Sequence, residues 1–156
     1  LHCSSAASDV YKRQVLRFSA AGISMLLIPR VASATEDEMN AAISQMFGDR
    51  PITEGRVSVD LPPIAENGFS VPIDIAVDSP MTEDDHVKQI VVFSPRNPLP
   101  VLAQYHLTPM SGRADVSARI RLGGTQSIRV IAEMNDGTLW SGAKQTLVTL
   151  AACVID

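Results

Sequence analysis

The sequence is poor in cysteine, with two in 156 residues, Cys3 and Cys153. Cys3 lies in residues 1–14, which we expect to be a non-native or pre-signal segment, and we therefore exclude it from the functional interpretation. Cys153 therefore has no partner in the remaining chain, so we expect no intramolecular disulfide. In an exported protein, a leftover cysteine of this kind indicates an intermolecular disulfide or a free reactive thiol.

Basic residues, long apolar runs and catalytic motifs are also scarce. Lys and Arg total 13 against 17 Asp and Glu, a net charge of -4, whereas a nucleic-acid-binding protein would carry a basic stripe. The apolar run at residues 18–28 is much shorter than the roughly 20 residues that cross a bilayer, so we expect no stable membrane insertion. The chain has no Gly-rich phosphate loop, no HExxH and no GxSxG motif.

The N-terminal part has the organisation of an export signal. Three basic residues precede the apolar run, and an Ala-Ser-Ala cleavage site ends at Ala34. We predict a signal peptide at residues 15–34, a non-native or pre-signal segment at residues 1–14, and a periplasmic location; a membrane anchor or a buried helix is the alternative. The stretch KRQVLRF resembles the twin-arginine signature and indicates that route. Cleavage leaves residues 35–156 with a net charge of 9 - 16 = -7.

The remaining chain predicts one helix followed by short strands. Thr35 and Glu38 match a capping box, an apolar stripe follows at i, i+3, i+4 spacing, and Gly48 ends the helix. From Gly55 the apolar period changes to two. The predicted strands are 57–61, 71–77, 88–93, 102–107, 116–122, 127–134, 138–140 and 144–150, with a hairpin at Asn135-Asp136-Gly137. This pattern favours an all-β, immunoglobulin-like antiparallel β-sandwich at residues 35–150, with one N-terminal helix.

The histidine, acidic and arginine residues are not strong candidates for a metal site or another binding site. His86 and His106 lie in different elements without a second ligand at metal spacing, and the acidic residues before His86 favour a solvated loop over a metal site. Four arginines lie on or beside the later strands: Arg113, Arg119, Arg121 and Arg129. Either they form a solvated sheet face with cross-strand pairs, or they form a face that binds an anion or a partner.

The C-terminal residues 151–156 directly follow the last predicted strand. Cys153 is thereby held on a short arm, which suits a carrier whose reactions are catalysed by other proteins. A hydrolase that uses Cys153 and His106 is disfavoured, because a nucleophile on a chain end lacks a preorganised pocket. The structural alternative is a small apolar residue that finishes a strand.

A set of short motifs is densest from Asn97 onward. They are Asn97-Pro98, Pro109-x-Ser111-Gly112-Arg113, Arg119-Ile120-Arg121-Leu122, Gln126, Ala132-Glu133-Met134 and Asp136-Gly137. With these motifs the chain resembles, over residues 35–153, the SoxY family of sulfur-carrier subunits of the thiosulfate-oxidising Sox system. The resemblance implies an immunoglobulin-like sandwich that pairs with a second sandwich, SoxZ. It also implies a C-terminal swinging arm whose Cys153 carries a covalent sulfur adduct, with no other cofactor and no catalysis by the chain itself.

The resemblance also implies partner enzymes. In the family, a c-type cytochrome complex couples thiosulfate to the arm cysteine, a dimanganese hydrolase releases sulfate, and some systems add a sulfur dehydrogenase. The family arm reads Gly-Gly-Cys-Gly-Gly, whereas Cys153 is flanked here by Ala151, Ala152, Val154 and Ile155, which stiffen and widen the arm. The alternative function is a structural or interaction subunit whose Cys153 forms an intermolecular disulfide.

Overall fold

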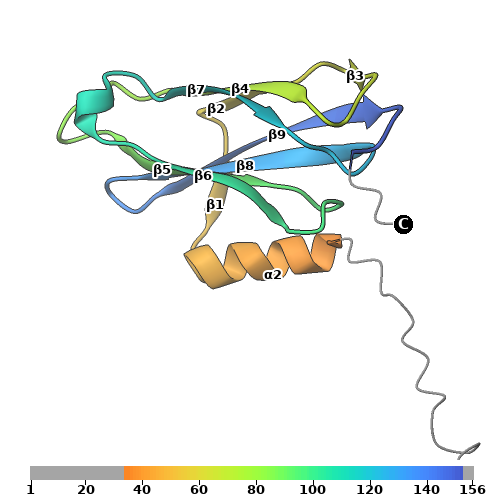
Figure 1. The fold of residues 1–156 in the computed structure, drawn as a ribbon. Coiled ribbons are helices and arrows are strands. Elements are labelled where there is room, and N and C mark those ends of the chain that lie inside the picture. The colour runs from red at the N-terminus through yellow and green to blue at the C-terminus, as the bar shows by residue number, and fades with distance from the viewer. Residues whose placement is uncertain (1–33, 153–156) are drawn as a thin grey trace, which may run out of the picture. The chain divides into compact units, whose positions relative to one another are not determined.

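Residues 34–152 are described by a computed structural model (Figure 1). Helix α2 (Glu36–Phe47) comes first. The strands follow as β1 (Ile52–Glu54), β2 (Val57–Asp60), β3 (Ile64–Ala65), β4 (Val71–Val77), β5 (Val87–Phe93), β6 (Val101–His106), β7 (Asp115–Ile120), β8 (Gln126–Met134) and β9 (Leu139–Val148), with a 3-10 turn at Pro109–Ser111 between β6 and β7. No helix among the described residues is long and apolar enough to cross a membrane. Apart from Ala34, the predicted signal peptide and the segment before it lie outside the described residues.

The strands form two sheets. The larger has the order β1-β9-β8-β5-β6, with β3 also paired to β9, and the smaller has the order β2-β4-β7. The long strands pair antiparallel, as predicted, but β1 and β3 pair with β9 in parallel, so the prediction of a purely antiparallel architecture is wrong at this edge. Strands of three and two residues carry too little apolar periodicity to be recognised in a sequence.

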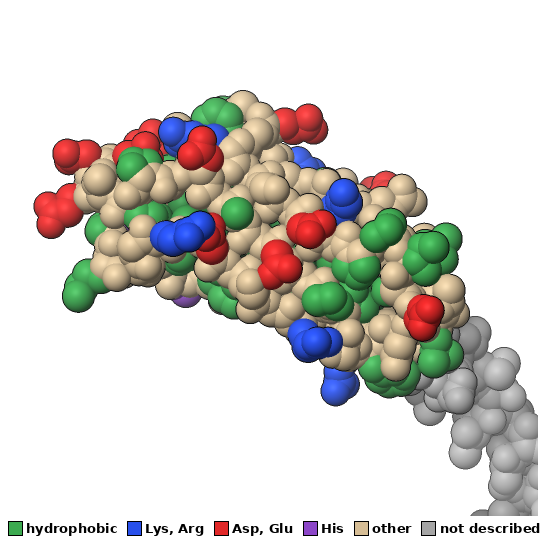
Figure 2. Space-filling view, turned by 90° about the horizontal axis from the view of Figure 1, so that it is seen from above, with side chains coloured by type: hydrophobic (Ala, Val, Ile, Leu, Met, Phe, Trp, Pro, Cys, Tyr) green, Lys and Arg blue, Asp and Glu red, His purple; other side chains and the backbone are tan. Residues whose placement is uncertain are grey.

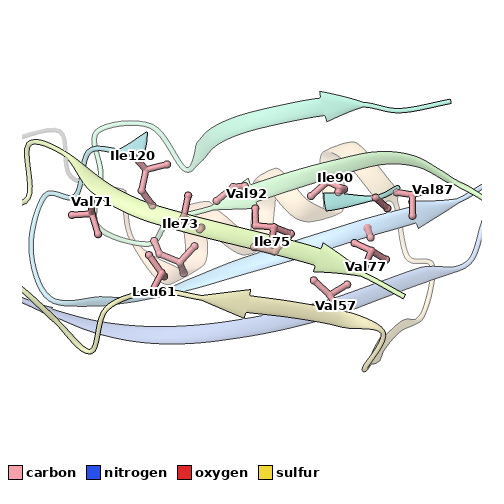
Figure 3. Packing of buried hydrophobic residues seen from close by; sticks show 14 of the residues in the cluster. Val57, Leu61, Val71, Ile73, Ile75, Val77, Val87, Ile90, Val92 and Ile120 are labelled. Atoms are coloured by element: carbon pink, nitrogen blue, oxygen red, sulfur yellow. The ribbon is translucent and has the colours of Figure 1, made fainter. Parts of the chain in front are cut away.

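The main core lies between the two sheets. Burial alternates along β4, so that Val71, Ile73, Ile75 and Val77 all point inward and are at most 5% exposed. Figure 3 shows these side chains meeting Ile90 and Val92 of β5, with Ile128, Val130 and Ala132 of β8 in the same cluster. Each fully buried Val or Ile side chain contributes about 1.5–3 kcal/mol of transfer free energy, so this cluster is the main source of stability.

Helix α2 covers the outer face of the larger sheet (Figure 1). Its Met39, Ile43 and Phe47 pack on apolar residues of β5, β8 and β9, and the rings of Phe47 and Phe93 meet edge to face with centroids 6.4 Å apart. The predicted capping box is present: the backbone N–H of Glu38 donates to the Thr35 hydroxyl and the backbone N–H of Thr35 donates to the Glu38 carboxylate. Within residues 34–152, the prediction of an all-β fold with an N-terminal helix is confirmed, and the immunoglobulin-like class stays a prediction.

Strand β9 is continuous where the sequence predicted two strands, 138–140 and 144–150. The residues between those segments include Gly142, which breaks the apolar alternation but not the strand. Glycine is required there because the backbone carbonyl of Val57 occupies the place that a side chain would take. The predicted hairpin at residues 135–137 is present between β8 and β9, with Gly137 at a φ of 85°.

Candidate functional site

Strand β9 leads directly to the predicted carrier residues. Cys153, Val154 and Ile155 lie outside the described residues. Ala151 and Ala152 are described, and both are half-buried. We call Leu150, Ala151 and Ala152 the arm root, because they are the described residues that connect β9 to Cys153.

The arm root is held by backbone hydrogen bonds to two loops. The N–H of Gly68, in the β3–β4 loop, donates to the carbonyl of Leu150 over 2.8 Å. The N–H of Ala152 donates to the carbonyl of Leu122, in the β7–β8 loop, over 3.0 Å. The N–H of Leu122 in turn donates to the carbonyl of Gly68 over 2.9 Å, so the arm root and both loops form one hydrogen-bonded unit. These hydrogen bonds therefore hold the chain as far as Ala152, the residue before Cys153.

Close packing at Gly68 explains why glycine is needed in this unit. A Cβ atom at this position would lie 2.5 Å from the carbonyl oxygen of Leu122 and 3.0 Å from that of Leu150. In the sequence, Glu66-Asn67-Gly68 is recognisable only as a turn, because a close approach between segments distant in the chain leaves no local signal. Gly68 is thus a residue of the site that sequence reasoning missed.

Two threonines fix the last residues before the arm root. The hydroxyl of Thr149 donates to the carbonyl of Glu66 over 2.8 Å, and the hydroxyl of Thr125 accepts from the N–H of Val148 over 2.9 Å. The N–H of Thr149 also donates to the carbonyl of Ala65 over 3.1 Å. These contacts tie the end of β9 to the same two loops that hold the arm root.

A buried network of polar side chains holds the β7–β8 loop in place. The amide of Asn97 donates to the carbonyl of Arg121 over 2.7 Å, and its oxygen accepts from the backbone N–H of Gly123 over 2.9 Å and from the side chain of Gln126 over 3.0 Å. The hydroxyl of Ser94 donates to Gln126 over 2.5 Å. Asn97 and Gln126 were recognised in the sequence only as parts of motifs. The structure shows that they position the loop whose Leu122 carbonyl binds the arm root.

The four arginines do not form one cluster. Arg119 and Arg121 are exposed and belong to the end of β7 and the loop after it, and Arg119 donates to the hydroxyl of Ser70 over 3.3 Å. Arg113 pairs with Asp115 over 2.7 Å. Arg129 lies on the larger sheet, half-buried beside a hollow of about 630 Å³ that α2 also lines. The anion-binding hypothesis for all four together is therefore not supported.

The acidic loop around His86 is held by protein contacts. His86 Nδ1 lies 3.0 Å from the carbonyl oxygen of Thr82, and the side-chain amide of Asn135 donates to the carbonyl of Asp84 over 2.7 Å. Within residues 34–152, no group of His, Cys, Asp and Glu is placed to hold a metal ion. In the neighbouring hairpin, hydrogen bonds from the backbone and the hydroxyl of Thr138 hold the pKa of Asp136 below its ordinary value.

Comparison with known proteins connects this architecture to sulfur metabolism. The family model of the sulfur oxidation protein SoxY matches residues 43–153. The sulfur carrier protein SoxY from Chlorobium limicola f thiosulfatophilum is 30% identical, with a TM-score of 0.62 over 73% of this chain and 98% of that one.

Two superoxide reductases have a similar fold. The neelaredoxin from Ignicoccus hospitalis is 19% identical, with a TM-score of 0.54 over 74% of this chain and 94% of that one. The enzyme from Nanoarchaeum equitans is 13% identical, with a TM-score of 0.51 over 61% of this chain and 99% of that one. At these identities the likeness concerns the fold alone. No curated protein sequence matches the chain.

Proposed function

The chain belongs to the SoxY family of sulfur oxidation proteins, and we therefore propose that it is a periplasmic carrier that holds thiosulfate-derived sulfur covalently on Cys153. As a member of this family it is a sulfur carrier and not an enzyme. The observation that carries the proposal is the extent of the family match, which runs through the core and ends on Cys153 itself.

The proposed chemistry uses one thiol and is catalysed by partner proteins. A c-type cytochrome complex removes two electrons as the Cys153 thiolate and the outer sulfur of thiosulfate form a disulfide bond, which gives Cys–S–S–SO3⁻. Water then attacks the sulfonate sulfur at a dimanganese hydrolase, which releases hydrogen sulfate and leaves a persulfide on Cys153. In some systems a sulfur dehydrogenase oxidises the remaining sulfur. Export through the signal peptide at residues 15–34 delivers the thiol to the compartment of these partners.

The described arm root supports this role. The hydrogen-bonded unit at Gly68 and Leu122 holds the chain up to Ala152, the residue before the proposed cargo residue. Cys153 therefore follows a fixed platform.

A second sandwich, similar to SoxZ, is part of the proposal. Within residues 34–152, β6 pairs only with β5, and β7 pairs only with β4. Strand β6 is therefore an edge of the larger sheet and β7 is an edge of the smaller sheet. A hollow of about 280 Å³ between the two edges is lined by Leu102, Tyr105, Arg119 and Arg121 among others. Natural proteins cover sheet edges of this kind, and a partner sandwich would do so here. The immunoglobulin-like character of the pair belongs to the same proposal.

Mass spectrometry of the Cys153 fragment tests the function. Trypsin cleaves after Lys144 and gives a fragment of residues 145–156 that contains Cys153. Thiosulfate and the cognate cytochrome complex are expected to add the mass of S2O3 to this fragment, in a form that dithiothreitol removes, and Cys153→Ser is expected to gain nothing. An unmodified wild-type fragment in the presence of an active cytochrome complex would refute the proposal. A Cys153-dependent covalent dimer on a non-reducing gel would instead support the structural alternative.

A further inference from the structure

Arg129 differs from the other cations of the chain. It is half-buried, whereas every other Lys and Arg within residues 34–152 is exposed. No residue that the structure describes makes a hydrogen bond or an ion pair with its side chain, although Arg50, Arg56 and Arg113 each pair with a carboxylate. Figure 2 shows the face of the smaller sheet, where Lys and Arg side chains are scattered and several lie beside Asp or Glu side chains. Because a guanidinium that is withdrawn from water needs an acceptor for its N–H groups, Arg129 is suited to an anion that the protein does not supply.

The strand register explains why no side chain reaches the Arg129 guanidinium. On the outer face of the larger sheet, its direct neighbours are Ala143 of β9 and Phe93 of β5, and neither side chain carries a hydrogen-bond acceptor. The next pair on the same face, Ser127 with Gln145, offers a hydroxyl and an amide, and both residues are exposed. Arg129 therefore lies at the border between the apolar area that α2 covers and an uncovered polar area.

Two hollows meet at Arg129. The larger, of about 630 Å³, extends to the first residues of α2, and we call it the Arg129 hollow. The smaller, of about 420 Å³, extends to Glu54 and Gly55, and both hollows are lined by Arg129 and Ala143. None of the described residues that line them is aromatic, so a nucleotide base would have no ring on which to stack. A small anion without a base fits this lining better.

The Arg129 hollow is locally positive in a chain whose net charge is -4. Arg96 and Arg129 line it against one carboxylate, Glu36, which gives a net charge of 2 - 1 = +1. Nη1 of Arg96 donates to the carbonyl of Thr125 over 3.0 Å, and this bond holds the second guanidinium at the wall of the hollow. In the smaller hollow the charge of Arg129 is opposed by Glu54. An anion is therefore favoured in the larger hollow.

We propose that the Arg129 hollow binds a tetrahedral oxyanion, a chemistry that sulfate, thiosulfate and phosphate share. The planar fork of a guanidinium donates two parallel N–H bonds to two oxygens of such an anion. Ser127 and Gln145 lie on the same sheet face and line the same hollow, where they supply neutral donors for the remaining oxygens. The inference does not depend on Cys153, and it adds a non-covalent site to the proposed covalent one.

Nuclear magnetic resonance titrations test the site. Cys153→Ser protein, in which the proposed cargo thiol is absent, is titrated with sulfate, thiosulfate, phosphate or acetate at constant ionic strength, because salt screens exposed charges. The signals followed are the Nε–H of Arg129 and the backbone N–H groups of Ser127 and Ala143. The variants are Arg129→Gln and Ala143→Glu, the second of which keeps Arg129 but places a carboxylate directly opposite it in the strand register. The matched control is Arg121→Gln, which removes the same charge from an exposed position in the β7–β8 loop.

At least one tetrahedral oxyanion is expected to give saturable shifts at all three groups, and the titrations identify which one. Acetate is expected to bind more weakly, because it has fewer oxygens. Arg129→Gln and Ala143→Glu should each raise the Kd at least about tenfold, since charge-assisted hydrogen bonds are lost, and Arg121→Gln should leave it unchanged. If Arg129→Gln does not fold, Ala143→Glu decides the question.

Three results would overturn the inference. They are the absence of saturable shifts with all three tetrahedral anions, equal affinity for acetate, and a Kd that is unchanged in the two hollow variants or raised equally in Arg121→Gln. None of them bears on sulfur carriage, which the mass of the Cys153 fragment tests separately.

Discussion

Gly68→Ala tests the structure of the arm root directly. The new Cβ would lie 2.5 Å from the Leu122 carbonyl oxygen, 3.0 Å from the Leu150 carbonyl oxygen and 3.0 Å from Cγ1 of Val148. Two of these atoms belong to the backbone, so no side-chain rotation relieves the contact. The Leu122 carbonyl must move, and it is the acceptor for the N–H of Ala152. The substitution should therefore loosen the residue that precedes Cys153.

The expected loss of stability follows from three contributions. Overpacking of a close contact costs about 1–3 kcal/mol. The weakened hydrogen bond between Ala152 and Leu122 adds about 0.5–1.5 kcal/mol. Because Gly68 is not at a positive φ, alanine recovers about 0.4–1 kcal/mol by restricting the unfolded chain. The net reduction in the free energy of unfolding is about 1–3 kcal/mol, or roughly 4–12 °C in Tm for a domain of this size.

Guanidinium unfolding and amide hydrogen exchange measure the two effects separately. Gly68→Ala should lower the unfolding free energy and accelerate exchange at Ala152, which reports local opening. Gly48→Ala is the matched control: a Cβ at Gly48 meets nothing within 4 Å, but its φ of 66° makes alanine costly. It should destabilise the protein without selectively exposing the Ala152 amide. Wild-type stability and wild-type Ala152 protection in Gly68→Ala would refute the proposed packing.

Two further substitutions test the network and the hairpin. Asn97→Ala removes three side-chain hydrogen bonds to Arg121, Gly123 and Gln126 and should lower the unfolding free energy by about 2–4 kcal/mol in guanidinium; Gln104→Ala, which loses only an exposed bond to Gln89, is the control, and equal losses would contradict the role of Asn97. Because the pKa of Asp136 is held below 3.8 by Thr138, its carboxylate contributes stability above that pH and loses the contribution as the pH falls through the lowered pKa. Asp136→Asn should therefore show a shallower loss of stability below pH 3.8, and parallel pH profiles for the two proteins would be the opposite result.

Local sequence signals predicted the elements that local chemistry determines. The capping box at Thr35 and Glu38, the alternation of β4 and the turn at Gly137 are all encoded within a few residues, and the structure has all three. At Gly142, in contrast, the sequence wrongly predicted a break between two strands. Glycine is needed at this position because the backbone carbonyl of Val57, a residue distant in the chain, comes close to it. The local apolar pattern therefore looked like a break in the strand.

The same limit applies to the candidate site. Cys153 was singled out from the sequence because an unpaired thiol is unusual in a chain that is predicted to be exported. The sequence did not indicate the close packing at Gly68, because this packing depends on three segments that meet only in the folded protein. The motif residues Asn97 and Gln126 were recognised, but their physical role appeared only when their hydrogen bonds to the β7–β8 loop were known.

The fixed arm root also bears on the alanines that replace the glycines of the family arm. Glycine is useful where a segment must remain free, and it loses more conformational entropy than any other residue when it is ordered. Ala152 is half-buried and bonded to Leu122, so this position is ordered and alanine suits it better than glycine.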